Sequence, residues 1–294
     1  MSRLDAESIV RNVSKRAPVL AFVSIKGGVG KTTLAIETAA ALAKYYDKKV
    51  LLVDANFSAP NIGLYLDLTK RGGEGKEYIT LHDALLGVGL HNAIYEAHGF
   101  DVVPASIDYA HKDYVDIFRL KKLLNKMRYR YDYIILDSAP NFNELKPVVA
   151  AADKIFIVTS PDEMTLTTSL QAAKVARQNK TPIHGIIVNR IRSPKHEMNV
   201  MQVEAHSGGI PVLARIQDHK KMASAAFSNE PITIHDEMNC VSREIRKFAS
   251  ALCGEPEDID SFFQRLLPFK DFFDRFDKDK VNREMYREEF YRSG

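Results

Sequence analysis

The sequence predicts an α/β fold in which a doubly wound, mostly parallel sheet carries helices on both faces. Short unbroken apolar runs alternate with helical stretches along the chain, a pattern typical of parallel strands that are buried on both faces. The composition is that of a globular protein: 294 residues, 45% hydrophobic and 27% charged, with a formal net charge of +3. A disordered chain and a strongly basic, dedicated nucleic-acid binder are therefore disfavoured.

The predicted elements follow one another in a regular order. Compact, β-rich apolar runs predict strands at 18–24, 50–54, 100–104, 133–137, 154–159, 183–189 and 210–214. Helical spacing of apolar residues predicts helices at 4–15, 32–45, 82–86, 92–96 and 116–129, with a polar, glycine-containing loop at 71–79. The chain becomes charged and phenylalanine-rich after Gly254, so we expect a domain at 1–254 and a C-terminal helical extension at 255–294.

Cysteine usage and the N-terminal sequence favour the cytoplasm. The two cysteines, Cys240 and Cys253, form no CxxC pair, so neither a disulfide framework nor a zinc site is predicted. No run of about 18 apolar residues is present, and the charged first residues lack the apolar core of a secretory signal. We therefore expect a cytoplasmic protein without a membrane-spanning helix.

The most specific motif lies between the first apolar run and the first long helix. It reads Lys26-Gly27-Gly28-Val29-Gly30-Lys31-Thr32-Thr33, a strand–loop–helix context that a phosphate-binding loop requires. Glycines let backbone N–H groups surround phosphate oxygens, and the following helix directs its positive dipole end at the same anion. Lys31 can then contact the β- and γ-phosphates, and the Thr32 hydroxyl can bind Mg²⁺. Gly27, Gly28, Val29, Gly30, Lys31, Thr32 and Thr33 are candidate contacts of ATP.

One departure from the generic phosphate-loop pattern identifies a narrower family. Ile25 stands where the generic pattern has its first glycine, and Lys26 follows it. This KGGVGKTT resembles the deviant phosphate loop of the MinD/ParA family of ATPases, most closely its archaeal MinD-like branch. The resemblance covers residues 18–253 and implies ATP and Mg²⁺ as ligands. It also implies an ATP-dependent homodimer, in which Lys26 reaches the nucleotide of the partner subunit.

Two further segments are similar to the switch regions of that family. Asp54-Ala55-Asn56-Phe57-Ser58-Ala59-Pro60-Asn61 follows the second strand at the position of switch I. The run 133–137 followed by Ser138-Ala139-Pro140 resembles the Walker B strand and switch II. Asp54 and Asp137 thus end strands at the sheet edge where ligands bind, and with Thr32 they are the predicted metal ligands. A structural turn aspartate is the alternative role for Asp54.

The end of the strand at 183–189 resembles the adenine-recognition segment of the family. Asn189 offers both a hydrogen-bond donor and an acceptor, which suits the adenine edge, and Arg190 follows it. Ile216-Gln217-Asp218-His219 aligns with the family's Ile-Pro-Glu-Asp segment, so Gln217 and Asp218 are further candidate contacts of the nucleotide. The Pro-to-Gln and Asp-to-His differences weaken that alignment.

Switch I departs from the family pattern at Asn56, where the family usually carries an aspartate that orients the attacking water. An asparagine amide can still position water but cannot act as a carboxylate. Lys26, Lys31, Asp54, Asn56 and Asp137 are the candidate catalytic residues, and slow hydrolysis with stimulation by a partner is expected. The alternative is a non-hydrolysing ATP-bound scaffold that recruits a partner protein, and an ATP-dependent ligase of the same superfamily is a more remote one.

The resemblance implies a role in cell division or chromosome partitioning, with a protein partner that the sequence does not identify. Residues 261–280 place phenylalanines at helical spacing and predict either a peripheral membrane contact or, as we favour, a helix packed on protein. Pro268 and the neighbouring acidic residues disfavour lipid. A basic helix, with Lys121, Lys122, Lys126, Arg128 and Arg130, could join Arg190, Arg192 and Lys195 in a patch for non-specific DNA binding, although a solvated face is favoured.

Overall fold

The computed structural model describes residues 16–68, 78–107, 115–193 and 195–255. Within them, one eight-stranded sheet has the order β3-β4-β2-β5-β1-β6-β7-β8, and neighbouring strands are parallel except at the β3–β4 pair. The strands are β1 (Val19–Val23), β2 (Val50–Ala55), β3 (Tyr95–Ala97), β4 (Phe100–Val103), β5 (Tyr133–Ser138), β6 (Lys154–Thr159), β7 (Ile183–Ile191) and β8 (Val212–Gln217). The predicted α/β class is confirmed.

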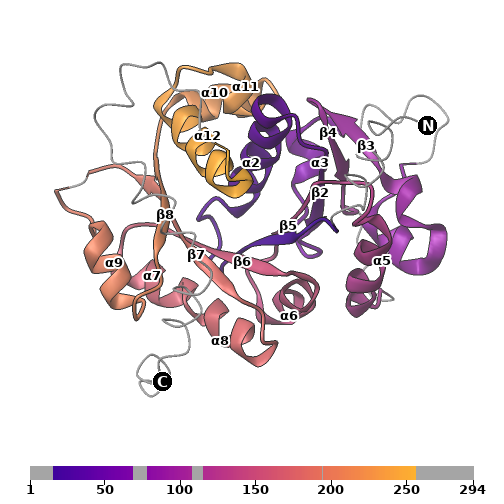
Figure 1. Ribbon diagram of the computed structural model, residues 1–294, viewed down its shortest axis with the longest axis horizontal. Helices are drawn as coiled ribbons and strands as arrows, with labels where there is room; N and C mark the ends of the chain where they lie inside the picture. Colours follow the sequence, from indigo (N-terminus) through magenta and orange to yellow (C-terminus); the bar gives the residue numbers. More distant parts are fainter. Residues whose placement is uncertain (1–15, 69–77, 108–114, 194, 256–294) are drawn as a thin grey trace, which may run out of the picture.

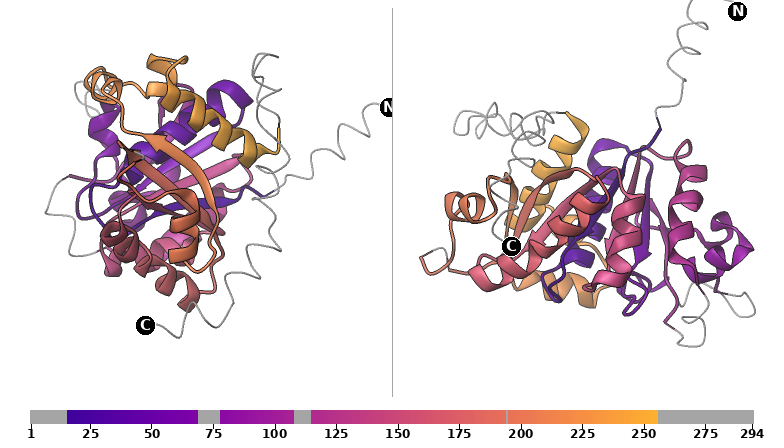
Figure 2. Two further views of the ribbon diagram at one scale, coloured as in Figure 1. Left: turned by 90° about the vertical axis from the view of Figure 1, so that its left-hand side faces the viewer. Right: turned by 90° about the horizontal axis from the view of Figure 1, so that it is seen from below.

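Helices cover both faces of this sheet, as Figure 1 shows. One face carries α2 (Lys31–Tyr46), α3 (Ile62–Tyr65), α10 (Lys221–Phe227), α11 (Ile232–His235) and α12 (Cys240–Cys253). The other carries α5 (Leu120–Met127), α6 (Phe142–Ala151), α7 (Glu163–Ser169), α8 (Gln171–Gln178) and α9 (Val200–His206). The side views in Figure 2 show the same layers, with α12 lying beside α2. Short turns complete the described chain: α4 (Leu81–Asp83), η2 (Ala84–Val88), η3 (Leu90–Ala93) and η5 (Ile117–Arg119).

The central strand shows why the sequence forms two separate cores. In β1, Val19, Ala21 and Val23 pack into the core on the α6 and α8 face, whereas Leu20 and Phe22 pack toward α2 and α12. This alternation follows from the two-residue period of a strand, and it requires the unbroken apolar run seen in the sequence. The Phe22 ring lies 6.3 Å from that of Phe248 on α12, in an edge-to-face contact.

The structure corrects the prediction of a short helix at 92–96. Residues Leu90–Ala93 form a 3₁₀ turn, and Tyr95–Ala97 instead pair with β4 as an antiparallel edge strand. His98 and Gly99 connect the two strands with φ values of 52° and 86°, which is the left-handed geometry of a tight hairpin turn. The predicted helix at 116–129 is also shorter, because residues 117–119 form a 3₁₀ turn before α5.

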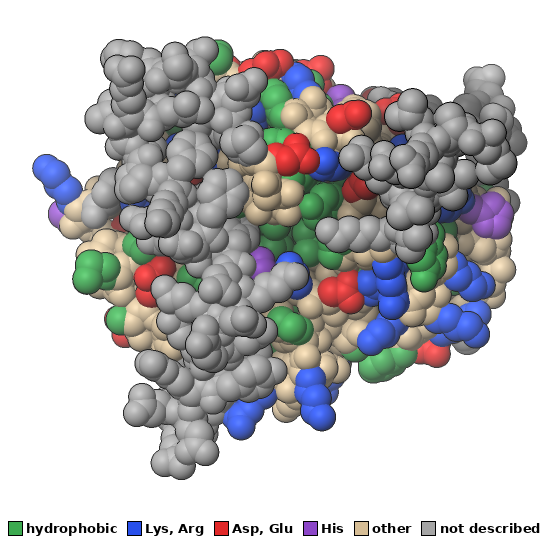
Figure 3. Space-filling model, in the orientation of Figure 1, with side chains coloured by type: hydrophobic (Ala, Val, Ile, Leu, Met, Phe, Trp, Pro, Cys, Tyr) green, Lys and Arg blue, Asp and Glu red, His purple; other side chains and the backbone are tan. Residues whose placement is uncertain are grey.

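The basic patch predicted around α5 is not a single surface. Arg128 is buried, where its guanidinium pairs with Asp153 and donates to the carbonyl of Ala17. The exposed basic side chains of α5 and the residues after it are Lys121, Lys122, Lys126 and Arg130, and Figure 3 shows basic side chains gathered in the region of α5. Arg190 and Arg192 lie at the end of β7, across several strands of the sheet. Arg128 therefore does not contribute to the predicted basic patch, whereas the other basic residues of α5 are exposed, as the favoured solvated face requires.

Helix α12 ends where the sequence predicts a boundary. Its C-cap, Gly254, has φ 68°, a left-handed conformation that glycine adopts without strain. The predicted extension, apart from Glu255, lies outside the described residues, as do the predicted helix at 4–15 and most of the loop at 71–79. Among the helices of the described chain, none has the length and apolar content needed to span a bilayer.

Candidate nucleotide site

The sheet brings the predicted site residues together at one edge. Strand β1 lies between β5 and β6, and the loop after β1 leads directly into α2. Phe22 on β1 pairs in register with Asp137 on β5, which in turn pairs with Asp54 on β2. The carboxyl ends of these parallel strands therefore place both aspartates beside the glycine-rich loop, where open α/β sheets bind ligands.

Glycine is required at two positions of this loop. Gly28 and Gly30 have φ values of 76° and 97°, which side chains adopt only with strain. A Cβ atom on Gly28 would have no heavy atom within 4 Å, whereas one on Gly30 would lie 2.2 Å from the Asn189 amide nitrogen. Gly27 and Gly28 are exposed, and Gly30 begins α2 as its N-cap. The loop therefore presents exposed glycine backbone at a helix N-terminus, a position that favours binding of a phosphate.

The two lysines of the loop occupy different environments. Lys31 is buried, and its Nζ lies 3.4 Å from the carbonyl oxygen of Lys26. Burial lowers the pKa of Lys31, an effect that the nearby Asp137 carboxylate partly opposes. Lys26 is exposed at the start of the loop, and Thr33 is half-buried in the first turn of α2. The Lys31 side chain therefore lies inside the loop, whereas Lys26 is exposed.

Thr32 and Asp137 form the part of the site that fits a metal ion. The Thr32 hydroxyl donates to Asp137 Oδ2 over 2.5 Å, and Asp137 Oδ1 is buried without a hydrogen-bond partner among the described residues. Burial raises the pKa of Asp137, while Thr32 and Lys31 act in the opposite direction. A hydroxyl and an unsatisfied carboxylate oxygen beside a phosphate-shaped loop are the hard oxygen ligands that Mg²⁺ takes. These residues therefore fit Mg²⁺ bound together with a nucleotide.

Both carboxylate oxygens of Asp54 accept hydrogen bonds from backbone N–H groups of switch I. Its Oδ2 accepts hydrogen bonds from the backbone N–H groups of Asn61 and Ile62, and its Oδ1 accepts one from Asn56, each over 3.1 Å. Asp54 thus satisfies backbone donors at the start of α3, as a capping residue does. Burial and the neighbouring Asp137 raise its pKa. The geometry corresponds to the structural role that the sequence left open as an alternative.

Both amide atoms of Asn56 are also used within switch I. The Asn56 Nδ2 donates to the Ala59 carbonyl over 2.6 Å, and its Oδ1 accepts from the Ala59 N–H over 3.2 Å. Asn61 Nδ2 donates to the same carbonyl over 2.8 Å. The Phe57 side chain is buried and packs edge-on against His82, with ring centroids 5.1 Å apart. Asn56 therefore closes a turn of switch I in this conformation.

A contact that sequence reasoning missed joins switch I to α6. The backbone N–H of Ser58 donates to Glu144 Oε2 over 3.0 Å. Asn141, the N-cap of α6, donates from Nδ2 to Glu144 Oε1 over 2.9 Å and lies 3.4 Å from the Ser58 hydroxyl. The two residues joined are 86 positions apart, so no local pattern predicts the contact. The one sequence signal for this region is Asn141-Phe142-Asn143-Glu144, which has the spacing of a helix N-cap followed three residues later by a carboxylate. This signal predicts the start of a helix but not the contact with Ser58.

The four residues predicted at the adenine end divide into two groups. Asn189 is buried against the glycine-rich loop, and its Nδ2 donates to the Val29 carbonyl over 2.8 Å. Arg190 is exposed, with φ 59°. Asp218 pairs with Arg192 over 2.6 Å, and the Gln217 side chain accepts a weak hydrogen bond from Cys240. The structure therefore joins Asn189 to the loop, whereas Gln217 and Asp218 contact β7 and α12.

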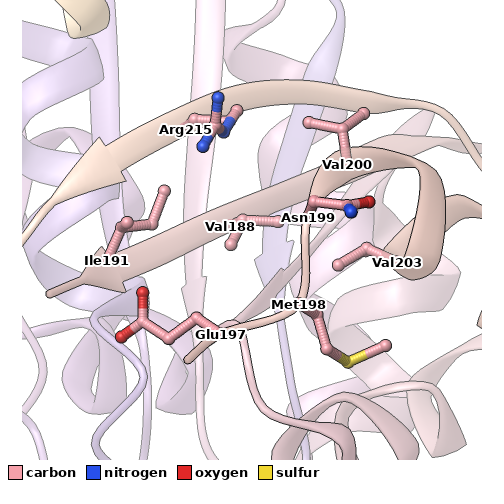
Figure 4. A pocket seen from close by; sticks show the side chains of 8 residues that line it. All are labelled: Val188, Ile191, Glu197, Met198, Asn199, Val200, Val203 and Arg215. Carbon is pink, nitrogen blue, oxygen red and sulfur yellow. The ribbon is translucent and has the colours of Figure 1, made fainter. Parts of the chain in front are cut away.

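Two hollows lie near the end of β7, and one candidate site residue, Arg190, lines the second of them. The first, shown in Figure 4, lies between β7, β8 and the segment leading into α9 and is lined by Val188, Ile191, Glu197, Met198, Asn199, Val200, Val203 and Arg215. Val188 faces this hollow, so Asn189, the next residue on the strand, faces the opposite side of the sheet. The second is an open cleft at the ends of β6 and β7, lined by Ser160, Pro161, Asp162, Glu163, Arg190, Arg192, His196, Glu197 and Met198.

The sequence of the chain is similar to those of known ATP-binding proteins. A family model described as an AAA domain matches residues 17–183, and a second with the same description matches 147–226. An uncharacterized ATP-binding protein of Methanocaldococcus jannaschii is 28% identical over 260 residues, which are 87% of this chain and 95% of that protein. The chromosome-partitioning ATPase Soj of Treponema pallidum is 32% identical over 248 residues, covering 78% of this chain and 94% of Soj.

A solved structure shows the same fold. The septum site-determining protein MinD of Pyrococcus horikoshii, in complex with Mg-ADP, matches 80% of this chain and 96% of its own with a TM-score of 0.73 at 24% identity. The glycine-rich loop, the paired strand-end aspartates and these similarities together establish that the chain belongs to the MinD/ParA family of P-loop ATPases.

Proposed function

We propose that this chain binds ATP together with Mg²⁺ and hydrolyses it slowly. The proposal is supported mainly by Asp137 Oδ1, a buried oxygen without a hydrogen-bond partner among the described residues. The other oxygen of this carboxylate accepts a hydrogen bond from Thr32, the residue that follows the glycine-rich loop and Lys31. Bound Mg²⁺ would neutralise charge on the phosphates. Backbone N–H groups of residues 27–33 and the Lys31 ammonium would hold the phosphate oxygens, and the Asn189 amide would contact the adenine. The Mg-ADP complex of the similar MinD structure supports this choice of ligands.

The nucleotide state would control dimerisation. Lys26 is exposed at the start of the loop. Its side chain is therefore free to extend away from its own subunit and contact the nucleotide of a partner subunit. We expect light scattering to show a dimer with Mg-ATP and a monomer with ADP or without nucleotide. Lys26→Ala should abolish the ATP-dependent dimer, whereas Lys122→Ala, an exposed lysine on α5, should leave it intact. A Lys26→Ala protein that dimerises like the wild type would contradict the switch.

A second function, a non-hydrolysing ATP-bound scaffold, is favoured by one observation. Both amide atoms of Asn56 are held by Ala59, so this side chain positions water only after the turn of switch I opens. Phosphate release by the purified protein discriminates the two functions. Steady release above that of a Lys31→Ala control supports the ATPase, and release equal to the control supports the scaffold.

The cellular role we propose is positioning of cargo for division or partitioning, through a protein partner. The named functions of MinD and Soj, which belong to those proteins, support this class of role. Residues 1–254 would form the switch and 255–294 an accessory segment. Peripheral membrane contact through 261–280 would appear as ATP-dependent sedimentation with anionic liposomes that is lost without this segment. Non-specific DNA binding is less favoured, because Arg128 is buried and the formal net charge of the chain is only +3.

A further inference from the structure

Two groups of hydrogen bonds, joined by the chain segment 137–141, lie between Thr32 and the outer turn of switch I. The connection begins with Thr32 and Asp137, passes along the short segment 137–141 to the N-cap of α6, and reaches Ser58 through Glu144. Switch II is therefore followed directly by Asn141, and Asn141 and Glu144 are the residues of this segment that contact switch I. The pairing of β5 with β2 ends at Ala55 and Ser138, so beyond that point the loops no longer share a strand ladder.

We propose that Glu144 is a positioning residue that couples switch I to switch II, so that the two segments respond to a bound nucleotide as one unit. The inference rests on the proposed binding of Mg-ATP and adds to it a residue outside the phosphate-loop and switch motifs. Glu144 acts through the backbone of Ser58, and the hydrogen bonds of its side chain go to Ser58 and Asn141. It is therefore not a catalytic residue.

The position of Ser58 in its loop explains why this contact is decisive. On one side of it, Phe57 is buried, and on the other, Ala59 is held by Asn56 and Asn61. Ser58 itself is exposed, and its N–H is satisfied by a carboxylate on another element. Hydrogen bonds to a charged acceptor are about twice as strong as neutral ones. Glu144 thus connects the exposed Ser58 of switch I to α6, whose N-cap, Asn141, directly follows switch II.

Glu144 also has a chemically defined partner, which makes a rescue experiment possible. Asn141 Nδ2 donates to Glu144 Oε1, while Asn141 Oδ1 accepts the backbone N–H of Glu144. In Glu144→Gln an amide nitrogen, which is a donor, replaces one of the two accepting oxygens. This nitrogen must face either the Ser58 N–H or Asn141 Nδ2, which are also donors, so one of the two hydrogen bonds is lost. Adding Asn141→Asp provides an acceptor for that nitrogen, preserves the N-cap and leaves the net charge unchanged. The double variant should therefore restore both contacts.

The test is hydrogen exchange of the full chain without nucleotide and with saturating Mg-ATP. The proteins are wild type, Glu144→Ala, Glu144→Gln, the double variant N141D/E144Q and the control Asn143→Ala, an exposed neighbour in the same turn. Without nucleotide, we expect the Ser58 amide of Glu144→Ala to exchange about tenfold faster than in the wild type. The dissociation constant for ATP should change by less than about threefold, because no phosphate-binding residue is altered.

The decisive readout is the nucleotide-induced protection of residues 56–61. In Glu144→Ala this protection should fall at least about fivefold, while that of 137–141 persists. The N141D/E144Q double variant should recover it, which a purely structural defect would not explain. Unchanged protection of 56–61 in Glu144→Ala, with ATP bound by the wild type, overturns the inference alone. Failure of the double variant to recover it also overturns the inference, and absence of ATP binding by the wild type overturns the proposed function as well.

Discussion

Replacing Asn56 by aspartate tests the account of switch I. The amide nitrogen of Asn56 lies 2.6 Å from the Ala59 carbonyl oxygen, in a side chain that is 5% exposed. Aspartate would place a carboxylate oxygen against that carbonyl and add a negative charge close to Asp54. A lost buried hydrogen bond costs about 1–3 kcal/mol, and Asn61 still donates to the same carbonyl. We therefore expect the free energy of unfolding to fall by about 2 kcal/mol at pH 8.

Thermal or urea unfolding in the absence of nucleotide measures this effect. A loss of about 2 kcal/mol corresponds to a decrease of about 4–8 °C in Tm for a domain of this size. The matched control is Asn61→Asp, which makes the same chemical change at the same carbonyl but on an exposed side chain, and should cost less than about 1 kcal/mol. The difference between variants should shrink toward pH 4, where a protonated carboxyl group at position 56 can donate again.

The same variant tests the catalytic interpretation of position 56. Aspartate restores the residue that the family usually carries, and the weakened turn frees it from Ala59. We expect Asn56→Asp to release phosphate faster than the wild type despite its lower stability. An Asn56→Asp protein as stable as the wild type at pH 8 would refute the structural reasoning. A wild-type hydrolysis rate equal to or above that of the variant would refute the catalytic part.

Two further predictions concern other parts of the fold. Gly30→Ala should reduce the affinity for ATP at least tenfold in a titration and lower the free energy of unfolding by about 1–2 kcal/mol. The reason is that the new Cβ would lie 2.2 Å from Asn189 Nδ2, on a residue whose φ is 97°. An unchanged ATP affinity would contradict this prediction. Burial raises the pKa of Glu37 from an ordinary value of 4.5 to about 7, so this group favours the folded state below pH 4.5 and its contribution is lost as the pH rises through 7. Urea unfolding measures the decrease in the free energy of unfolding between pH 5 and pH 8. This decrease should be about 3 kcal/mol smaller in Glu37→Gln than in the wild type. An equal decrease in both proteins would exclude the effect.

The parts of the fold that the sequence predicts are those determined by local patterns. The unbroken runs at 18–24, 50–54 and 133–137 appear as β1, β2 and β5 within two residues at either end. They could be predicted because strands covered on both faces need apolar side chains in both directions. The loop after β1 could be located because glycines with positive φ and a following helix leave a specific sequence signature.

The missed features depend on tertiary contacts. The edge strand β3 is three residues long and becomes a strand only by pairing with β4. Arg128 has the sequence context of an exposed basic face, but it is buried because Asp153 neutralises its charge at the start of β6. The closed turn of Asn56 and the contact between Ser58 and Glu144 join groups whose relation depends on the folded loop. Sequence reasoning could therefore locate switch I but could not determine which way its side chains face.

The central claim is that residues 26–33 bind the phosphates of ATP with Mg²⁺. Calorimetric titration of the purified chain with ATP in the presence of Mg²⁺ tests it most directly, with Lys31→Ala as the variant and Lys48→Ala, a lysine that pairs with Glu255 away from the loop, as the control. We predict saturable binding by the wild type and the control, and at least tenfold weaker binding by Lys31→Ala. Absence of binding by the wild type, or equal affinity in Lys31→Ala, would contradict the account.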